Sequence, residues 1–462
     1  MDLKDLLVTP LVLFAIYLAA YTVRPFFTNA VTRRYFIPGL TAKVVGAIAV
    51  GFIYQFYYGG GKPSGDTFNY FANAEIIVEA FGDSFRTGWQ LLLARGEYTP
   101  ETFQYASRMY WFHSSTEYFI IRIVAVLQLL TFSTYSAVAV LFAALTFSGV
   151  WALYRAFYKF YPSLHLALAG AVLFVPSVIF WGSGILKDSV TLGALGWATW
   201  AIVRIFFERK GMVVAGIILL LALYTIYAVK IYIVLCFLPA ALLWVFLSNI
   251  GRVRSVVLRA LIAPVVLAIA VVLGYYAVLA IGEDNNRYAL DKLSETAEIT
   301  ARYLQYVGEK QGGSVYVLGD DYDFSVWGML RKFPLAVNVT LFRPYLWEVY
   351  NPVMLLSALE SFLTLLFTLY IFFRAGPVRT LQLATTQPII IFCLVFSIVF
   401  SFAVGISTYN FGSLVRYKIP MFPFYLSGLF ILQFYTRSRW STVDGRPPLA
   451  PLAVGRRPST VD

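Results

Sequence analysis

Apolar and polar stretches alternate along almost the whole chain, and most apolar runs approach the length that a membrane passage requires. The runs lie at 6–23, 44–58, 118–132, 137–154, 164–180, 190–207, 212–228, 231–247, 256–281, 353–373, 388–405 and 419–434. Because several runs are short or interrupted by proline, we predict roughly 11 to 13 transmembrane helices. The expected fold class is an all-α polytopic membrane protein with outer-side amphipathic helices and a re-entrant segment.

The composition agrees with this class, since 60% of the residues are hydrophobic and only 13% are charged. The net charge of +12 has two candidate sources, the positive-inside bias of membrane proteins and a phosphate-bearing ligand, and we expect no nucleic acid. Both cysteines lie in apolar runs, which argues against a disulfide framework. No cofactor is indicated except a divalent cation, which acid-rich residues 320–323 could hold unless they form a solvated loop.

Charged residues between the runs predict the domain organisation and the orientation. Residues 436–462 are rich in Arg, Pro and Gly, which predicts a disordered, basic cytoplasmic tail behind a single transmembrane domain of residues 1–435. Basic loops then place two long segments, 59–117 and 282–352, on the outer side of the membrane.

The orientation rule conflicts with itself between residues 118 and 180. The first loop is placed inside by its basic residues Arg24, Arg33, Arg34 and Lys43. The loop after residue 208 is also placed inside, by its own basic residues. One intervening run must then fail to cross. We favour run 164–180, which Pro176 breaks, as a re-entrant segment that enters and leaves on the outer face, with a full crossing as the alternative.

An acidic residue follows the second run, on the predicted outer side. Asp66 could act as a general base on an incoming hydroxyl group, with Asn69 and Tyr70 in support. The alternative is that Asp66 or its neighbour only caps the helix that follows. Further along this segment, residues 72–81 and 85–94 have the pattern of short helices on the membrane surface.

A polar stretch at residues 180–189, which we call the island, interrupts two long apolar runs. Charged groups at membrane depth are costly unless they pair or face water, so the island is a candidate functional site. Lys187 lies beside a predicted helix start, where a phosphate would be favoured, with Ser183 and Asp188 in support. The alternative is that Lys187 and Asp188 only reach a water interface between two helices.

Two further motifs carry candidate phosphate-binding cations. Arg343 could hold a diphosphate bidentately, or it could form an interfacial pair with Glu348 among aromatic anchors. Arg416 and Lys418 lie on the outer side, against the positive-inside bias, and either bind a ligand or are the snorkelling end of a helix.

Three isolated charges have weaker interpretations. Lys230 separates two apolar runs, which predicts an outer hinge or a buried partner for an acidic residue. Arg122 and Glu117 lie close together in the sequence and could be purely structural.

Several short elements occur in a fixed order from residue 59 to residue 424. They are Gly65-Asp66-Thr67 with Tyr70, Pro176 with Trp181-Gly182-Ser183-Gly184 and Lys187-Asp188, Arg343-Pro344 with Trp347-Glu348, and Arg416-Tyr417-Lys418 with Pro420. The acid in the first large outer loop resembles GT-C superfamily glycosyltransferases, and the later elements resemble bacterial polymerase-like membrane proteins of cell-surface polysaccharide synthesis. The chain departs from the commonest GT-C pattern in having an additional first helix and a single acid rather than an adjacent pair.

The resemblance implies a glycosyltransferase of the bacterial inner membrane that works on the extracytoplasmic face. Its donor would be a polyprenyl-phosphate-linked sugar and its acceptor a hydroxyl of a glycan or lipid. Asp66 would be the base, and the candidate cations Lys187, Arg343, Arg416 and Lys418 would neutralise the leaving phosphate. The alternatives are a polysaccharide repeat-unit polymerase that uses diphosphate-linked glycans, in which the arginines outrank Asp66, and a flippase or transporter of lipid-linked sugars.

Overall fold

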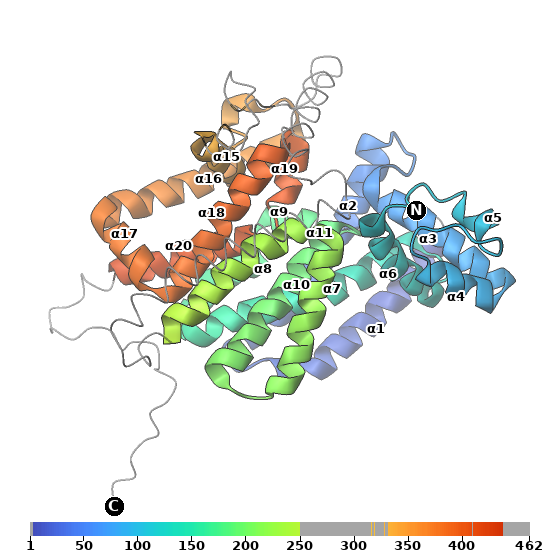
Figure 1. The fold of residues 1–462 in the computed structure, drawn as a ribbon, viewed down its shortest axis with the longest axis horizontal. Coiled ribbons are helices and arrows are strands. Elements are labelled where there is room, and N and C mark those ends of the chain that lie inside the picture. The colour runs from blue at the N-terminus through green and yellow to red at the C-terminus, as the bar shows by residue number, and fades with distance from the viewer. Residues whose placement is uncertain are drawn as a thin grey trace, which may run out of the picture. The chain divides into compact units, whose positions relative to one another are not determined.

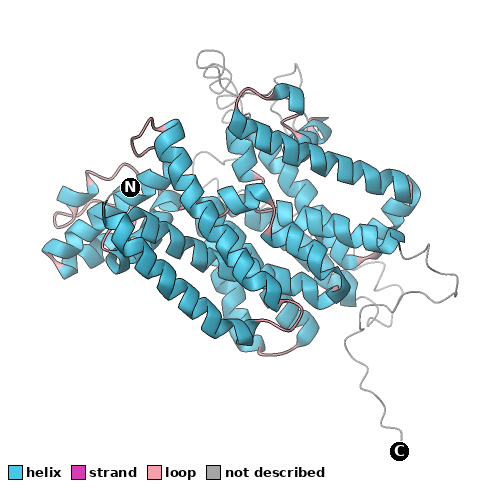
Figure 2. Ribbon diagram, turned by 180° about the vertical axis from the view of Figure 1, so that it is seen from behind, coloured by secondary structure: helices cyan, strands magenta, loops and turns pink. Residues whose placement is uncertain are grey.

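A computed structural model of the chain describes residues 3–249, 331–408 and 410–437, together with Tyr316, Leu318 and Gly328. These residues form helices joined by loops, and no β-strand is drawn among them (Figures 1 and 2). Contacts divide the chain into two compact units, Met1–Ile231 and Tyr232–Asp462, which are described separately below as unit 1 and unit 2. The predicted all-helical, multi-pass class is confirmed.

Within the described residues, seven helices are long and apolar enough to cross a membrane, or eight if one bent helix pair counts as a span. This is fewer than the number of passages that we predicted, for four reasons. Run 118–132 forms a helix of only 17 residues, and run 164–180 is divided into two shorter helices. Runs 212–228 and 231–247 both lie within one helix, Met212–Asn249, which is kinked at Lys230. Run 256–281 lies outside the described residues.

Unit 1 contains the elements of the first half of the chain in this order. They are α1 (Leu3–Phe27), α2 (Arg33–Phe52), η1 (Ile53–Tyr58), α3 (Gly65–Asp83), α4 (Phe85–Leu93), α5 (Phe103–Ala106), α6 (Ser115–Thr131), α7 (Tyr135–Phe160), η2 (Pro162–Leu164), α8 (His165–Leu173), α9 (Pro176–Trp181), α10 (Lys187–Ile202), η3 (Val203–Glu208) and the first part of α11 (Met212–Asn249). The predicted surface helices at 72–81 and 85–94 correspond to parts of α3 and α4.

One end of unit 1, which we call the Asp66 end, joins the starts of α1, α3 and α7. The Asp5 carboxylate of α1 accepts a hydrogen bond of 3.0 Å from the backbone N–H of Ser136 in the first turn of α7. The hydroxyls of Thr67 in α3 and Tyr135 in α7 lie 2.7 Å apart. These contacts place the three helix starts at a common level.

The opposite end, which we call the Arg33 end, joins the end of α1 to the start of α2 and the end of α7 to the end of η3. Arg24 donates a hydrogen bond of 2.8 Å to the carbonyl of Arg33. Lys159 of α7 forms an ion pair of 3.2 Å with Glu208 of η3. Arg24, Arg33 and Lys159 therefore lie at one end of unit 1.

The segment 164–180 runs alongside α2 from the Arg33 end toward the Asp66 end. His165, at the start of α8, lies 2.8 Å from the hydroxyl of Tyr35 near the start of α2. Further along, Gly46 packs so closely against Ile179 that a methyl group on Gly46 would lie 2.0 Å from the Ile179 carbonyl oxygen. The re-entrant interpretation of this segment is therefore wrong. Pro176 breaks the helix because it lacks an N–H, but the chain continues in the same direction.

Helix α6 does not meet the expectation of a crossing at run 118–132. It has 17 residues and is not among the helices of the described part of the chain that are long and apolar enough to cross a membrane. In its first turn, Glu117 lies beside Lys187, the first residue of α10. Its side chain Gln128 donates a hydrogen bond of 2.8 Å to the carbonyl of Phe71 in α3, so α6 packs against α3.

Helices α7 and α10 approach each other through glycine. A methyl group on Gly149 would lie 1.9 Å from the carbonyl oxygen of Gly193, and one on Gly196 would lie 1.9 Å from that of Gly149. Small residues at helix crossings allow close backbone contact inside membranes, where water provides no driving force. This contact fixes α10, and therefore the island at its start, against α7.

Unit 2 contains the second part of α11 and the elements α15 (Phe333–Phe342), η5 (Leu346–Glu348), α16 (Pro352–Ala375), α17 (Pro377–Thr386), α18 (Pro388–Thr408), α19 (Phe411–Tyr417) and α20 (Phe422–Arg437). Its core is rich in phenylalanines that pack edge to face, such as Phe392, Phe396 and Phe424. Helices α19 and α20 are bent by 65° at Lys418, so the bent pair of this fold lies here rather than at 164–180. Most of segment 282–352 and the tail after residue 437 lie outside the described residues.

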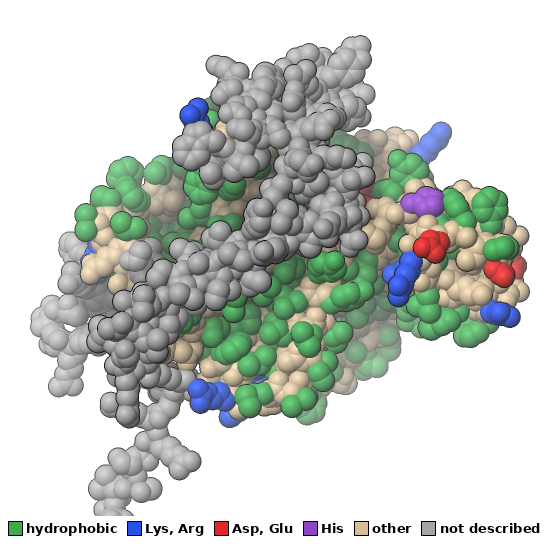
Figure 3. Space-filling view, in the orientation of Figure 1, with side chains coloured by type: hydrophobic (Ala, Val, Ile, Leu, Met, Phe, Trp, Pro, Cys, Tyr) green, Lys and Arg blue, Asp and Glu red, His purple; other side chains and the backbone are tan. Residues whose placement is uncertain are grey.

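The surface of unit 1 has the character of a lipid-facing bundle. In the face drawn in Figure 3, hydrophobic side chains cover the helical surface and charged side chains gather toward its margins. Exposed leucines on α11 such as Leu220, with 70% of its surface accessible, agree with this distribution. The protein is therefore a multi-pass integral membrane protein.

Candidate functional site

The island is buried between α9 and α10, and a lysine from another helix binds its backbone. Lys43 of α2 is only 2% exposed, and its ammonium donates a hydrogen bond to the carbonyl of Gly182. Gly182 is the C-cap of α9, where helix carbonyls lack intrahelical partners and a cation is favourable. We assigned Lys43 to the inner loop from its charge, but it lies within the second span.

Lys187 forms an ion pair with Glu117. Its ammonium contacts the Glu117 carboxylate and donates a hydrogen bond of 2.8 Å to the hydroxyl of Thr116. The side chains of Lys187 and Glu117 are 14% and 22% exposed, so the pair is largely shielded from solvent. The contact joins the first turns of α6 and α10.

Lys230 forms a second ion pair with Asp188, at 2.5 Å. Asp188 is fully buried in the first turn of α10, where the helix dipole favours a carboxylate, and the Lys230 side chain is 9% exposed. Lys230 has φ −152° and ψ 85°, which interrupts the helical conformation of α11. The predicted pairing of Lys230 with a buried acid is thus confirmed, and Lys230 also lies at a break between two helical stretches.

These two pairs form what we call the ionic cluster, made of Glu117, Lys187, Asp188 and Lys230. It lies where α6 and α10 begin and where α11 is interrupted. Because the two charges of each sign balance, the cluster is compatible with a buried position. Arg122 is not part of it, since its guanidinium donates to the carbonyl of Ala94.

Tyr54 connects the start of α3, where Asp66 lies, with the island. Asp66 occupies the first turn of α3 and is partly buried, and the cap residue Ser64 makes no side-chain capping bond. Gly65, with φ +70°, packs so closely on Tyr54 that a methyl group would lie 2.3 Å from the ring. The Tyr54 ring in turn lies 6.2 Å from that of Trp181, in the helix that leads into the island. A carboxylate and the island therefore occupy the same end of unit 1.

The predicted supporting residues of this region make structural contacts. Tyr70 is 3% exposed and packs against Trp111 with ring centroids 4.8 Å apart. Ser183 is fully buried and donates to the carbonyl of Ile179. Asn69 is exposed, and its backbone carbonyl accepts a hydrogen bond from a side chain one turn later.

In unit 2, Arg343 is held by an acid and by aromatic rings. Its Nε lies 3.0 Å from both carboxylate oxygens of Glu348. The guanidinium carbon also lies 5.1 Å from the ring centroid of Phe411, 5.7 Å from that of Tyr316 and 5.8 Å from that of Tyr345. The predicted Arg–Glu pair with aromatic anchors is confirmed.

Lys418 belongs to the same region of unit 2. It is fully buried, and its ammonium donates a hydrogen bond of 2.9 Å to the hydroxyl of Ser361, which donates one of 3.2 Å to the carbonyl of Arg343. A snorkelling end is therefore wrong for Lys418. Arg416, two residues earlier, lies with its guanidinium carbon 5.9 Å from the ring centroid of Tyr417. Two of the four predicted phosphate-binding cations, Arg343 and Lys418, are thus linked through Ser361, and Arg416 is two residues from Lys418.

The structure also identifies polar partners that our sequence analysis did not assign to these sites. Thr116 and Glu117 bind Lys187, Lys43 binds the island, and Ser361 links Lys418 to Arg343. A usable signal existed for Glu117, which is the last charge before an apolar run. No comparable signal distinguishes Ser361, because serine is common in membrane helices.

No group of three or more His, Cys, Asp or Glu side chains that could hold a metal ion occurs in the part of the chain that the structure describes. The acid-rich residues 320–323, our candidate for a divalent cation, lie outside that part.

The fold and these sites define a multi-pass, all-helical membrane protein with ionisable groups buried at helix breaks. No protein-family model, no curated protein and no solved structure matches the chain.

The Lys187–Glu117 pair predicts a pH dependence of stability. Burial raises the pKa of Glu117, but the charge of Lys187 and the hydrogen bonds from Lys187, Ser114 and Thr116 outweigh burial and lower it. A carboxylate with a lowered pKa stabilises the fold above its unfolded pKa of about 4.3 and loses this contribution as the pH falls further.

We therefore expect Glu117→Gln to lower the thermal midpoint at neutral pH, and the difference from wild type to shrink below about pH 4.3. Thermal unfolding of both proteins in detergent, followed across this pH range, measures the difference. A difference that does not shrink at any pH below about 4.3 would contradict the assigned pairing.

Proposed function

We propose that the protein is a membrane glycosyltransferase that moves a sugar from a polyprenyl-phosphate-linked donor to an acceptor hydroxyl. The observation that carries the proposal is the common location of Asp66 and the island at one end of unit 1. That end carries a partly exposed carboxylate and two paired lysines whose side chains are 14% and 9% exposed. This combination supplies a base and cations at the boundary of an apolar bundle, where a lipid-linked phosphate would lie.

The proposed location is the extracytoplasmic face of a bacterial inner membrane. The Arg33 end carries Arg24, Arg33 and Lys159, and the positive-inside rule places such an end in the cytoplasm. The Asp66 end then faces outward. A lipid-linked donor agrees with this orientation, because such a donor requires no nucleotide sugar at the outward face.

The proposed reaction is a direct displacement at the anomeric carbon. The acceptor hydroxyl gives its proton to the carboxylate of Asp66, and its oxygen forms the new glycosidic bond. The bond between the anomeric carbon and the phosphate oxygen breaks, and its electron pair leaves with polyprenyl phosphate. Lys187 stabilises the added negative charge on that phosphate, which is the largest electrostatic contribution expected in such chemistry. The anomeric configuration is inverted.

The second candidate is a polysaccharide repeat-unit polymerase with a diphosphate-linked glycan donor. The observation that favours it is the gathering of Arg343 and Lys418, with Arg416 nearby, in unit 2. A diphosphate needs more positive charge than a monophosphate, and a guanidinium binds it bidentately. In this case the arginines contribute more to the rate than Asp66 does.

The two candidates predict opposite rankings of two variants. We expect Asp66→Asn to reduce transfer from polyprenyl-phosphate sugars more than Arg343→Ala does, measured with purified protein in lipid vesicles. A larger loss from Arg343→Ala, with elongation of a diphosphate-linked glycan, would favour the polymerase. Because removal of Arg343 leaves Glu348 without this partner, folding of that variant is checked by its thermal midpoint, and Arg343→Lys, which keeps the charge, serves as the second variant.

A further inference from the structure

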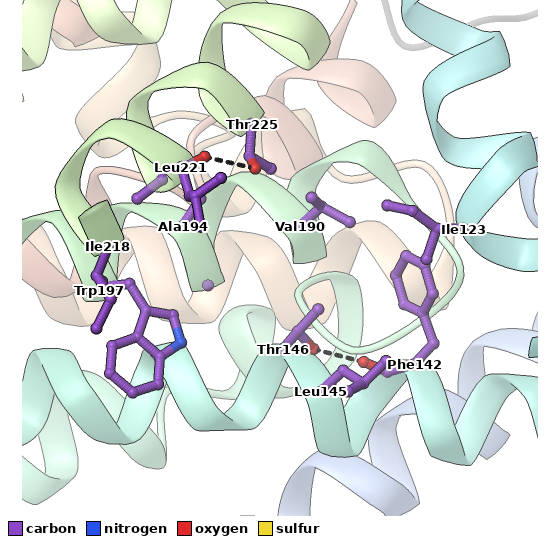
Figure 4. A pocket seen from close by; sticks show the side chains of 12 residues that line it. Ile123, Phe142, Leu145, Thr146, Val190, Ala194, Trp197, Ile218, Leu221 and Thr225 are labelled. Carbon is purple, nitrogen blue, oxygen red and sulfur yellow. Dashed lines mark hydrogen bonds between the residues drawn. The ribbon is translucent and has the colours of Figure 1, made fainter. Parts of the chain in front are cut away.

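An apolar groove of about 380 Å³ lies between α6, α7, α10 and α11 of unit 1. Side chains from all four helices point into it, including Ile123, Phe142, Val190 and Thr225 (Figure 4). Its polar side chains do not offer hydrogen bonds to a ligand. The hydroxyl of Thr146 donates to the carbonyl of Phe142, and that of Thr225 donates to the carbonyl of Leu221. The lining is therefore suited to hydrocarbon.

The groove is accessible from the lipid-facing surface of unit 1. Leu221, which lines it, is 60% exposed, and Leu145 on the opposite wall is 55% exposed. Its volume lies at the lower end of the range of about 300–1,000 Å³ found for small-molecule sites. A space of this size and shape suits one hydrocarbon chain better than the two chains of a phospholipid.

The same helices that line the groove also carry the ionic cluster at its Asp66 end. Val190 follows Lys187 by three residues on α10, so the two side chains share a helix face about one turn apart. On α6, Ile123 follows Thr116 by seven residues, again on one face. On α11, Thr225 precedes Lys230 by five residues. An apolar groove thus ends about one to two helical turns from two ammonium groups.

We propose that this groove binds the hydrocarbon chain of a single-chain lipid phosphate, with the phosphate at Lys187. The Lys187 ammonium uses two of its three N–H groups for Thr116 and Glu117, and its side chain is partly exposed. The groove and the cluster together match both parts of such a lipid. The inference rests on the proposed function in one respect, because it identifies the lipid with the polyprenyl chain of the donor.

The test compares identical substitutions at two neighbouring exposed leucines of α11. Leu221 lines the groove, whereas Leu220 is 70% exposed and does not. Purified protein in vesicles is irradiated with a polyprenyl phosphate that carries a diazirine in its chain, and labelled residues are identified by mass spectrometry. A second series uses phosphatidylglycerol with a diazirine in one acyl chain.

We expect the polyprenyl probe to label groove residues such as Trp197 and Ala222. Leu221→Trp should reduce this labelling about tenfold, the change that 1.4 kcal/mol of lost affinity produces, while Leu220→Trp leaves it unchanged. The proposal would be overturned if the phosphatidylglycerol probe labelled the groove as strongly as the polyprenyl probe. It would also be overturned if Leu221→Trp did not reduce labelling by the polyprenyl probe.

The outcome separates this inference from the proposed function. Specific groove labelling by a protein that transfers no sugar would support the lipid site and refute the glycosyltransferase. Sugar transfer that Leu221→Trp does not affect, together with an unlabelled groove, would refute the lipid site and leave the glycosyltransferase in place.

Discussion

Replacing Asp188 by Asn should lower the thermal stability of the protein strongly. The substitution leaves the Lys230 ammonium, 9% exposed, without its carboxylate partner. Breaking a buried ion pair from one side costs about 3–5 kcal/mol, because the remaining charge stays desolvated. Lys230→Met should have a similar effect. The thermal midpoint in detergent and the yield of monodisperse protein measure both.

The double variant Asp188→Asn/Lys230→Met tests whether the loss comes from the unpaired charge. It should recover much of the stability that either single variant loses, since neither charge of this pair remains buried without the other. The exposed pair of Glu79 and Arg108, with side chains 47% and 51% accessible, provides the matched control. Glu79→Gln should change stability by less than about 1 kcal/mol. Single variants as stable as this control would show that the buried pair is not formed.

Asp66→Asn should reduce the rate of sugar transfer about 10²–10⁴-fold, the usual contribution of a positioned general base. Donor binding should change little, because the carboxylate contacts the acceptor hydroxyl and not the phosphate in the proposed reaction. The loss should therefore appear in kcat and not in KM for the donor. Initial rates with purified protein in vesicles measure both constants.

Glu75→Gln provides the control for Asp66→Asn. Glu75 is exposed on the same helix, α3, and its substitution removes the same charge. It should leave the rate unchanged. An Asp66→Asn protein that retains full transfer would exclude Asp66 as the base.

The fold class could be predicted from the sequence because apolar run length reports directly on membrane passage. The break at Lys230 was also predictable, since a charge between two apolar runs marks a boundary. Run 118–132 was predicted to cross but forms a helix of only 17 residues, and run 164–180 was predicted to be re-entrant but runs alongside α2. Both are apolar and short, and what decides between them is their contacts with α2 and α3, which hydropathy does not encode.

The candidate site was predictable only in part, because pairing partners come from distant helices. Charge and position identified Lys187, Asp188 and Lys230 as unusual residues within an apolar chain. Nothing in the sequence joins Lys187 to Glu117, which is 70 residues away, or Lys43 to the Gly182 carbonyl. The position of Lys43 was also misleading, because a lysine just before an apolar run, here run 44–58, is ordinarily part of a basic loop, whereas Lys43 lies inside α2.

The most direct test of the account is a mass balance for the donor in sealed vesicles. Purified protein is supplied with a polyprenyl-phosphate sugar and an acceptor. Three quantities are then measured: the glycoside formed, the free polyprenyl phosphate released, and the donor that remains in each leaflet. The account predicts that each new glycosidic bond, inverted at the anomeric carbon, appears with one polyprenyl phosphate. Intact donor that only changes leaflet would contradict it and identify a transporter.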